Sequence, residues 1–362
     1  MRAGSRPTEE RSPESMSIIE IGRPFVKYAY DNTRCFASRM TGSIVPVQLE
    51  PFYKLPSALA DPNLDFVICH APVSSPLSPR WWLRNIGTRR FLRAYLPLTS
   101  LISPQILRKS IRAPLAVVDL EDTPFLRRDD LFLLDRADLW FKRELPIDHW
   151  KIFMLTDHSS VPTQRYRQIE KHRKRIEKLR PISIGPPIGF DETYPDRPLA
   201  KTSDIFFAGL VDGSSTVRGR GIQQVRKLQT EGYRIDLPSG RLDKKEFVRR
   251  AASAHLVWSP EGYGNDCFRH YEAPMCWSVP LINRMSIERY APLQDGVHAV
   301  YYEVEGDGLI NAAKKALMDR EKLSSMASTA RQHVVDHHHM RSIVRHVIHE
   351  TTAANDAIHP KI

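Results

Sequence analysis

The sequence is poor in cysteine, with four residues in 362 (Cys35, Cys69, Cys267 and Cys276). None of the four belongs to a Cys-x-x-Cys pair, and so few cysteines in so long a chain argue against a disulfide framework. The sequence also lacks a run of about 18 apolar residues, which a membrane-spanning helix would need. The N-terminal region also lacks the apolar segment that is typical of a secretory signal. We therefore expect a protein of the reducing cytoplasm.

Composition and length favour two globular domains. Apolar residues make up 41% of the chain and charged residues 26%, which is typical of globular proteins. A chain of 362 residues is long enough for each of two domains to bury its own core. Residues 1–16 are polar and rich in proline and serine, so we expect them to be disordered. The net charge of +11 suits polyanions, nucleotide phosphates or anionic membranes, and does not choose among them.

Short apolar runs alternate with helical patterns along the first half, as in parallel βαβ units. We predict a Rossmann-like domain over residues 17–180 and a proline-rich linker over 181–198. Within this domain we expect strands at 64–69, 115–119 and 139–141, and helices near 82–95, 129–136 and 164–179.

The second half shows the same alternation, and we predict a second Rossmann-like domain over 199–336, followed by a C-terminal helix and tail over 337–362. The expected strands are 204–208, 233–237, 255–259 and 279–283, and the expected helices are 221–231, 243–253, 266–277, 309–318 and 321–333. Asp243 is the expected N-cap of its helix. The predicted fold is α/β, with the two Rossmann-like domains facing each other across a cleft.

Residues 259–283 carry the most informative pattern, a strand end, a glycine loop, a helix and a strand. Gly262 and Gly264 let the backbone approach a ligand. A helix that begins near Asp266 would offer free N–H groups and its dipole to a phosphate. Arg269 lies in the first turn of this helix, and Glu272 lies one turn later on the same side. A guanidinium and a carboxylate in this arrangement suit the diphosphate and the ribose of a nucleotide.

This pattern resembles the C-terminal half of GT-B glycosyltransferases, in particular the exostosin-like and family 1-like domains. The resemblance is carried by Ser259-Pro260, Gly262, Gly264, Asp266, Arg269, Glu272 and Ser278-Val279-Pro280. It implies that Glu272 holds the ribose and Arg269 the diphosphate. The commonest GT-B pattern has two glutamates eight residues apart, whereas Glu261 and Glu272 are eleven apart here, so Glu261 is not carried over.

A second loop, residues 206–221, supports the same site. Gly209 follows a predicted strand, and Arg218 and Arg220 open the next predicted helix. In GT-B enzymes the matching loop contacts the donor phosphates, so the resemblance assigns both arginines to diphosphate binding. Asp-x-Asp after a strand is not evident. We therefore expect neither a metal ion nor a cofactor, and arginines and helix N-termini would neutralise the leaving group of a nucleotide diphosphate sugar.

The first half should bind the acceptor. Asp119, Glu121 and Asp122 follow a predicted strand at the edge where α/β sheets place their sites. Asp119 or Asp122 could act as a general base on an acceptor hydroxyl, and His70, which also follows a strand, is a further candidate. Lys142-Arg143-Glu144-Leu145 resembles a stretch that precedes the linker in related transferases.

Each candidate also has a structural interpretation. Glu272 could pair with Arg269 on an exposed face, Arg218 and Arg220 could be solvated charges, and the acidic residues could cap a helix or form a turn. His70 could be a satisfied histidine at a strand end. The run 337–339 of histidines invites a metal interpretation, but consecutive helical residues point in different directions. The basic helix 164–179 and the arginine- and aromatic-rich stretch 80–96 could touch an anionic membrane.

We interpret the chain as a glycosyltransferase of polysaccharide or glycoconjugate synthesis, independent of metal. The expected partners are a nucleotide-sugar donor, a glycan or glycolipid acceptor and, peripherally, the anionic inner face of the membrane. Two alternatives stay open, a GT-B-like protein that binds glycans or sugar nucleotides without catalysis, and a basic nucleic-acid-binding protein. No RNA- or DNA-binding motif supports the latter, so nucleic acid is not expected. A dinucleotide-dependent dehydrogenase is excluded because Gly-x-Gly-x-x-Gly is missing after an early strand.

Overall fold

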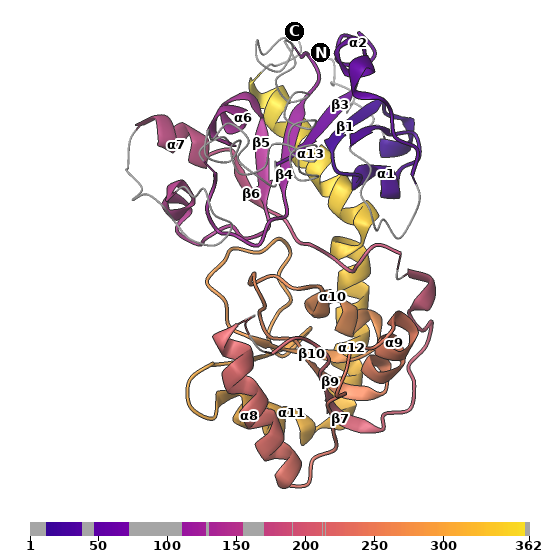
Figure 1. The fold of residues 1–362 in the computed structure, drawn as a ribbon, viewed down its shortest axis with the longest axis vertical. Coiled ribbons are helices and arrows are strands. Elements are labelled where there is room, and N and C mark those ends of the chain that lie inside the picture. The colour runs from indigo at the N-terminus through magenta and orange to yellow at the C-terminus, as the bar shows by residue number, and fades with distance from the viewer. Residues whose placement is uncertain are drawn as a thin grey trace, which may run out of the picture.

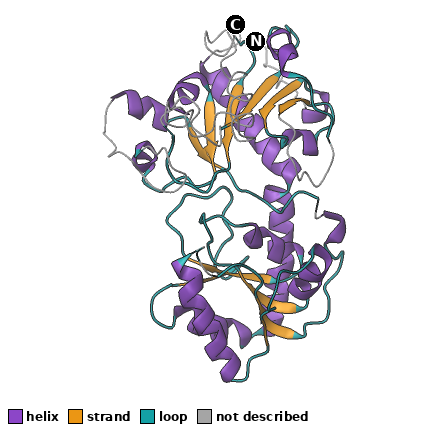
Figure 2. Ribbon diagram, viewed as in Figure 1, coloured by secondary structure: helices purple, strands orange, loops and turns teal. Residues whose placement is uncertain are grey.

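The computed structural model describes residues 12–37, 47–71, 111–127, 130–154, 170–189, 191–211, 213 and 215–358. These residues form two lobes, each built on its own parallel β-sheet (Figures 1 and 2). The predicted pair of parallel-sheet α/β units is therefore confirmed.

The first sheet has six parallel strands in the order β2-β1-β3-β4-β5-β6. They are β1 (Ile18–Gly22), β2 (Arg34–Ala37), β3 (Phe66–His70), β4 (Leu115–Asp119), β5 (Leu139–Lys142) and β6 (Leu179–Pro181). The predictions for β3, β4 and β5 are confirmed to within two residues, whereas β1, β2 and β6 were missed. Because Asp119 pairs in register with Lys142, the ends of β4 and β5 bring charged side chains to one edge of the sheet.

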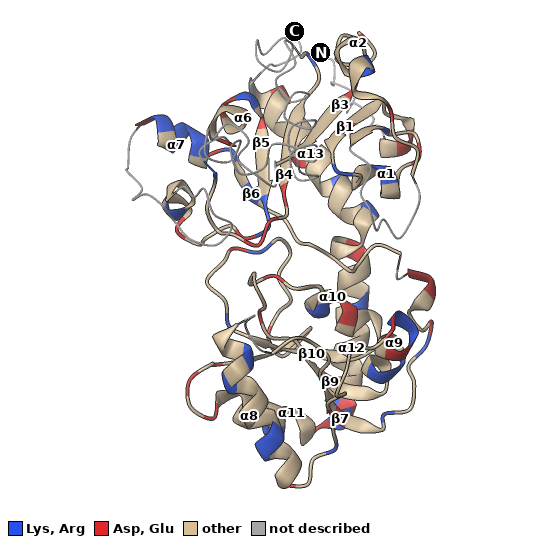
Figure 3. Ribbon diagram, in the orientation of Figure 1, with Lys and Arg blue, Asp and Glu red and all other residues tan. Residues whose placement is uncertain are grey.

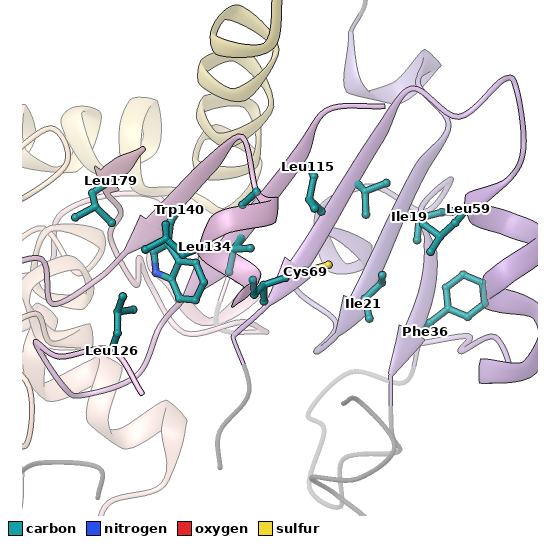
Figure 4. Packing of buried hydrophobic residues seen from close by; sticks show 14 of the residues in the cluster. Ile19, Ile21, Phe36, Leu59, Cys69, Leu115, Leu126, Leu134, Trp140 and Leu179 are labelled. Atoms are coloured by element: carbon teal, nitrogen blue, oxygen red, sulfur yellow. The ribbon is translucent and has the colours of Figure 1, made fainter. Parts of the chain in front are cut away.

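Hydrophobic side chains cover both faces of this sheet. Alternate residues of each strand enter opposite clusters, as Ile19 and Ile18 do on β1, because side chains of a strand point to alternate faces. Figure 4 shows one of these clusters, with Trp140 and Phe36 among its members. The surrounding helices are α1 (Val26–Ala29), α2 (Leu55–Leu59), α6 (Asp130–Arg136) and α7 (Glu170–Ile176), with short 3₁₀ turns at Pro13–Ser15, Phe52–Lys54 and His149–Phe153. A further 3₁₀ turn, Asp191–Thr193, contacts helix α9 of the second lobe.

The second sheet has five parallel strands in the order β11-β10-β9-β7-β8. They are β7 (Ser203–Phe206), β8 (Ile235–Asp236), β9 (Ala254–Trp258), β10 (Val279–Asn283) and β11 (Val300–Tyr302), and the helices are α8 (Thr216–Thr230), α9 (Lys244–Ala252), α10 (Phe268–Met275), α11 (Gly308–Leu317) and α12 (Arg320–His333). Asp243 caps α9 as predicted, since its side chain accepts a hydrogen bond from the Glu246 N–H. Of these elements the sequence analysis missed only β11.

Helix α8 begins five residues before the predicted start at 221. The side chain of Ser215 caps it by accepting a hydrogen bond from the Val217 N–H, and serine is a favoured N-cap residue. Arg218 therefore lies in the first turn of α8, and Arg220 lies inside the helix. The prediction that the arginines open this helix is confirmed for Arg218, whereas the predicted start at 221 was late because this cap was overlooked.

The C-terminal helix returns to the first lobe. After a π-helical turn at Val334–His338, α13 (Met340–Ile358) runs from the second lobe towards the first sheet (Figure 1). Its residues Ile343, Val344, Val347 and Ile348 are buried in one cluster with residues of β1, β3, β4 and β5. The chain thus crosses between the lobes twice, once through the segment after β6 and once at the start of α13.

Several boundaries differ from the predictions. Residues 12–16, expected to be disordered, include the turn Pro13–Ser15, and Asn32 Nδ2 donates hydrogen bonds to the carbonyls of Pro13, Glu14 and Met16. The predicted linker begins at Pro181, which is the last residue of β6. The helix expected near 82–95, and the whole stretch 80–96, lie outside the described residues.

The basic helix expected at 164–179 is described only from Glu170, and α7 ends at Ile176. Lys171, Arg173 and Lys174 are exposed on it, whereas Arg175 is buried and donates two hydrogen bonds of 2.7 Å to Asp135. Figure 3 shows the concentration of basic residues on α7. No helix among the described residues is both long and apolar enough to span a bilayer.

Candidate functional site

Two loops of the second lobe meet at the guanidinium group of Arg269. This residue lies in the first turn of α10, and its Nε donates a hydrogen bond of 3.0 Å to the carbonyl of Ala208, just after β7. The guanidinium carbon lies 5.2 Å from the centre of the Phe207 ring. A Cβ atom at residue 209 would collide with the guanidinium. Gly209 therefore provides the space that Arg269 occupies.

Arg218 lies beside the same loops and is 7% exposed. Its Nε donates to the Glu261 carbonyl at 2.8 Å and its Nη1 to the Leu210 carbonyl at 2.9 Å. A Cβ at residue 262 would lie 2.5 Å from its Nη2, so Gly262 makes room for Arg218 as Gly209 does for Arg269.

The two arginines lack the partners that buried cations usually have. Burial lowers the pKa of Arg269, and the positive charge of Arg218 lowers this pKa further. The charge of Glu272 opposes this shift, but among the described residues neither guanidinium lies within ion-pair distance of a carboxylate. Each arginine bonds only to backbone carbonyls there. Two neighbouring cations held in this way form a site for an anion such as a diphosphate.

Glu272 lies one turn after Arg269 on α10 and is 8% exposed. Burial raises the pKa of its carboxyl group to about 7, and the charge of Arg269 opposes this shift. Within the described part of the chain, no hydrogen-bond donor contacts the carboxylate and no ion pair joins it to Arg269. The exposed Arg269–Glu272 pair considered above is therefore not what the structure shows. A buried carboxylate without donors is suited to accept hydrogen bonds from a ligand.

Asp266 does not face these groups. Helix α10 begins at Phe268, two residues later than predicted, and the Asp266 carboxylate is buried within the protein. It accepts hydrogen bonds from the Ile184 N–H at 2.9 Å and the Tyr271 hydroxyl at 2.7 Å, and Arg289 lies 3.4 Å away. Burial raises the pKa of this carboxyl group, but hydrogen bonding from His270 and the charges of Arg289, His270 and Arg143 outweigh burial and lower the pKa. The structure thus places Asp266 in a structural network that joins the interlobe segment to α10.

Gly264 and the amides after it face the first lobe. A Cβ at residue 264 would lie 2.6 Å from Glu144 Oε1 and 2.9 Å from Asp122 Oδ1. The N–H groups of Asn265 and Asp266 donate to Glu144 at 2.8 and 2.9 Å. The amide of Asp266, at the predicted start of the helix, is therefore not free for a phosphate, because a carboxylate of the first lobe binds it.

Arg220 is not brought to the site. It is exposed on α8, and residues two apart on a helix do not share a face. The geometry therefore does not support its assignment to diphosphate binding. Arg220 is instead a solvated charge, which was the alternative interpretation.

The acidic candidates of the first lobe are engaged in ion pairs. Asp119 is buried and its Oδ2 accepts from Lys142 Nζ at 2.7 Å. Asp122 is half exposed, and its Oδ1 lies 2.6 Å from Arg143 Nη1. Burial and the charge of Asp119 raise the pKa of Glu121. Both predicted acidic bases therefore contact cations of the first lobe, Lys142 and Arg143.

His70 is held in a different manner. Its Nε2 lies 2.9 Å from Glu20 Oε1 at the end of β3, and its ring packs edge-on against Phe25. Glu20 is fully buried and also accepts hydrogen bonds from the N–H groups of Phe25, Val26 and Lys27 at the start of α1. A histidine bound to a carboxylate through one ring nitrogen is held in a fixed orientation with the other nitrogen available.

Sequence reasoning missed Glu20, Arg143 and Glu144 as parts of this region. The signal for Glu20 was a charge inside an apolar run, Ile18–Gly22. The signal for Arg143 and Glu144 was the Lys-Arg-Glu-Leu stretch after β5, which was noted only as a weak resemblance. The histidine run 337–339 proved structural at His338, which is buried with its Nδ1 2.8 Å from the Ser183 hydroxyl. No cluster of potential metal ligands occurs among the described residues.

Comparison with known proteins gives structural relatives only. The sequence matches no protein-family model and no curated protein. HepE from Anabaena, solved in complex with UDP, is 13% identical with a TM-score of 0.53, and the match covers 93% of this chain and 100% of that one. A glycosyltransferase from Rickettsia africae is 8% identical with a TM-score of 0.52, over 96% and 99% of the two chains.

The N-terminal domain of trehalose-6-phosphate phosphatase from Candida albicans is also similar, at 11% identity and a TM-score of 0.53, over 97% of this chain and 98% of that one. Identities this low show the fold alone, and a fold does not by itself define an activity. With two facing parallel-sheet lobes and these neighbours, the chain has the fold of the GT-B glycosyltransferases, as the sequence predicted.

Proposed function

We propose that this protein transfers a sugar from a nucleoside diphosphate sugar to an acceptor hydroxyl without a metal ion. The observation that carries the proposal is the pair Arg218 and Arg269, two adjacent guanidinium groups with no carboxylate partner among the described residues. The buried carboxylate of Glu272 lies one turn away. A nucleoside diphosphate presents an anion to the first two groups and ribose hydroxyls to the third.

The reaction assigns a role to each group. The bond between the sugar C1 and the β-phosphate oxygen breaks, the acceptor oxygen bonds to C1, and the nucleoside diphosphate leaves. Arg218 and Arg269 stabilise the negative charge that grows on the leaving phosphate. Glu272 holds the ribose and so fixes the position of the phosphates.

His70 is the best placed of the three predicted acceptor-side bases. Asp119 and Asp122 each contact a cation, whereas His70 is bonded to the carboxylate of Glu20 through Nε2. Its Nδ1 would take the proton of the acceptor hydroxyl, and Glu20 would stabilise the imidazolium that results.

The experiment compares Arg218→Ala with Arg220→Ala, two arginines on the same helix of which only the first faces the site. Binding of UDP, GDP and ADP is measured by calorimetry in EDTA, together with Arg269→Ala and Glu272→Ala. We expect at least one nucleotide to bind the wild type. Loss of a charged hydrogen bond should weaken this binding by about 10- to 100-fold in Arg218→Ala and Arg269→Ala. Glu272→Ala should show a comparable loss.

Arg220→Ala should bind like the wild type, and His70→Ala should keep nucleotide affinity while losing release of nucleotide from a nucleotide sugar. Equal affinity in Arg218→Ala and Arg220→Ala would contradict the proposed site. Nucleotide binding by the wild type without any turnover on a panel of nucleotide sugars and glycan acceptors would favour the alternative of a binding protein without catalysis.

The finer features belong to this proposal as well. The motif Gly262 to Glu272 supports an exostosin-like relationship and a role in polysaccharide or glycoconjugate synthesis, with a glycan or glycolipid as acceptor. The low cysteine content supports a cytoplasmic location. Peripheral contact with the inner membrane face is supported by the basic residues of α7 and of the stretch 80–96, and that stretch lies outside the described residues.

A further inference from the structure

We propose that Arg143 and Glu144 of the first lobe are positioning residues for the donor site of the second lobe. They follow β5, yet they bind the loop 262–267 between β9 and α10. This inference rests on the proposed function, because it concerns the loop that would lie beside the nucleotide.

Glu144 holds the N–H side of this loop. Its carboxylate is fully buried and accepts hydrogen bonds from Asn265 N–H and Nδ2 at 2.8 and 3.0 Å, and from the Asp266 N–H at 2.9 Å. Burial raises the pKa of the carboxyl group, while Arg143 and these donors act in the opposite direction. A buried carboxylate that accepts several hydrogen bonds is held rigidly, because the loss of a donor would leave its buried charge uncompensated.

Arg143 holds the carbonyl side of the same loop. Its Nε and Nη2 both donate to the Asp266 carbonyl, with an Nε–O distance of 3.0 Å. Its Nη1 donates to the Leu120 carbonyl at 3.0 Å and pairs with Asp122 at 2.6 Å. Consecutive residues of the first lobe thus bind the N–H and the C=O of one residue, Asp266, in the second lobe.

The contact continues along the neighbouring loop. The Glu288 N–H donates to the Leu145 carbonyl at 2.8 Å, and Pro146 forms a β-bridge with Ile287. The segment after β5 is therefore docked along two loops at the carboxyl edge of the second sheet. Gly264 makes the approach possible, since a Cβ there would lie 3.0 Å or less from Glu144, Asp122 and Arg143.

The consequence concerns the residues on either side of this loop. Gly262 and Glu261 are packed around Arg218, and Arg269 lies just beyond the loop. The conformation of the loop therefore sets the distance between the two guanidinium groups. A loop that is already ordered loses less entropy when a ligand binds. We therefore assign nucleotide affinity in part to Arg143 and Glu144, although neither is among the residues proposed to touch the nucleotide.

The test uses the full chain and the substitution Glu144→Gln, with Glu288→Gln as the matched control. Glu288 also joins the lobes, through His149 at 2.6 Å, but its side chain is 46% exposed and does not bind the loop 262–267. The second test variant, Asn265→Ala, removes one bond to Glu144 from the other side and is expected to fold even if Glu144→Gln does not. Folding is followed by circular dichroism, and the dissociation constants of UDP, GDP and ADP by calorimetry.

We expect Glu144→Gln to weaken nucleotide binding by about 10-fold, the effect of losing acceptors for buried donors, and Asn265→Ala by a smaller factor. Glu288→Gln should bind like the wild type. In transfer assays the KM for the nucleotide sugar should rise more than kcat falls, and Glu144→Asp should recover part of the affinity. Folded Glu144→Gln and Asn265→Ala proteins with unchanged nucleotide affinity overturn this inference alone. A wild type that binds none of the nucleotides overturns the proposed function and this inference with it.

Discussion

Glu272 occupies a position at which ionisation costs stability. Burial raises the pKa of its carboxyl group from 4.5 to about 7. In the unfolded chain the same group ionises near its ordinary pKa. Between these two values the folded protein keeps a proton that the unfolded chain has released, so the stability of the free protein falls as pH rises through this window.

The substitution Glu272→Gln removes this dependence. We expect the unfolding free energy of Glu272→Gln, relative to the wild type, to increase by about 3 kcal/mol between about pH 5 and about pH 8. The measurement is urea unfolding of both proteins across this range, without nucleotide. The same variant should bind nucleotide less tightly, because the glutamine amide has one acceptor oxygen for the ribose hydroxyls where the carboxylate has two. A difference that does not vary with pH would show that Glu272 keeps its ordinary pKa and is not desolvated.

The roles of individual residues were predicted unevenly, for a physical reason. Arg269 and Glu272 are three positions apart on one helix, so their shared face follows from helical geometry, and their neighbourhood could be expected from the chain alone. Arg143 and Glu144 act on a loop more than a hundred positions away in the sequence. The Lys-Arg-Glu-Leu stretch after β5 was their local signal, and it does not indicate which distant loop the two residues bind.

At the scale of elements, α8 contains two glycines in different surroundings. A Cβ at Gly219 would meet open space, whereas a Cβ at Gly221 would collide with the indole ring of Trp258 on β9. Gly221 thus lets α8, which carries Arg218, pack closely against the second sheet.

These glycines provide a matched pair of substitutions. Gly219→Ala should stabilise the protein by about 0.5–1 kcal/mol, because alanine favours the helix and restricts the unfolded chain. Gly221→Ala should instead destabilise it by about 1–3 kcal/mol, because the added methyl group overpacks the contact with Trp258. Thermal and urea unfolding of the two variants test this difference in sign. Stabilisation by both substitutions would mean that α8 does not pack closely at Gly221.

The missed elements show where sequence patterns stop being informative. β1 was overlooked because Glu20 interrupts its apolar run, and this glutamate is tolerated only because the amides of α1 and His70 surround it. β2, β6 and β11, with four, three and three residues, were also overlooked, although β7 and β8, with four and two residues, were predicted. The long α9 and α12, with their capping aspartates, were predicted nearly to the residue.

At the scale of the whole molecule, α13 links the second lobe to the first. It contacts α1, β4 and β5, and Ile343 and Val347 are fully buried there. The chain order would place this helix in the second domain, whereas its apolar face belongs to the core of the first.

Ile343→Ala tests this arrangement. Removal of the buried carbon atoms of the Ile343 side chain should destabilise the protein by about 2–5 kcal/mol. Amide hydrogen exchange should become faster in β4 and β5 rather than in β9 and β10. His349→Ala, at an exposed position of the same helix, should leave both unchanged. Faster exchange confined to the second sheet would contradict the assignment of α13 to the first core.

The amino-acid sequence by itself determined the alternation of strands and helices, the pair of parallel-sheet α/β domains and the shared helical face of Arg269 and Glu272. These features depend on local periodicity, capping and helical spacing, which are written in consecutive residues. Only the tertiary structure decided that the carboxylates of Asp266 and Asp119 bind donors inside the protein. It also decided that Glu144 binds the Asp266 amide and that α13 packs in the core of the first lobe. Each of these outcomes depends on contacts between charges or apolar faces that are far apart in the sequence, and local sequence patterns do not predict such contacts.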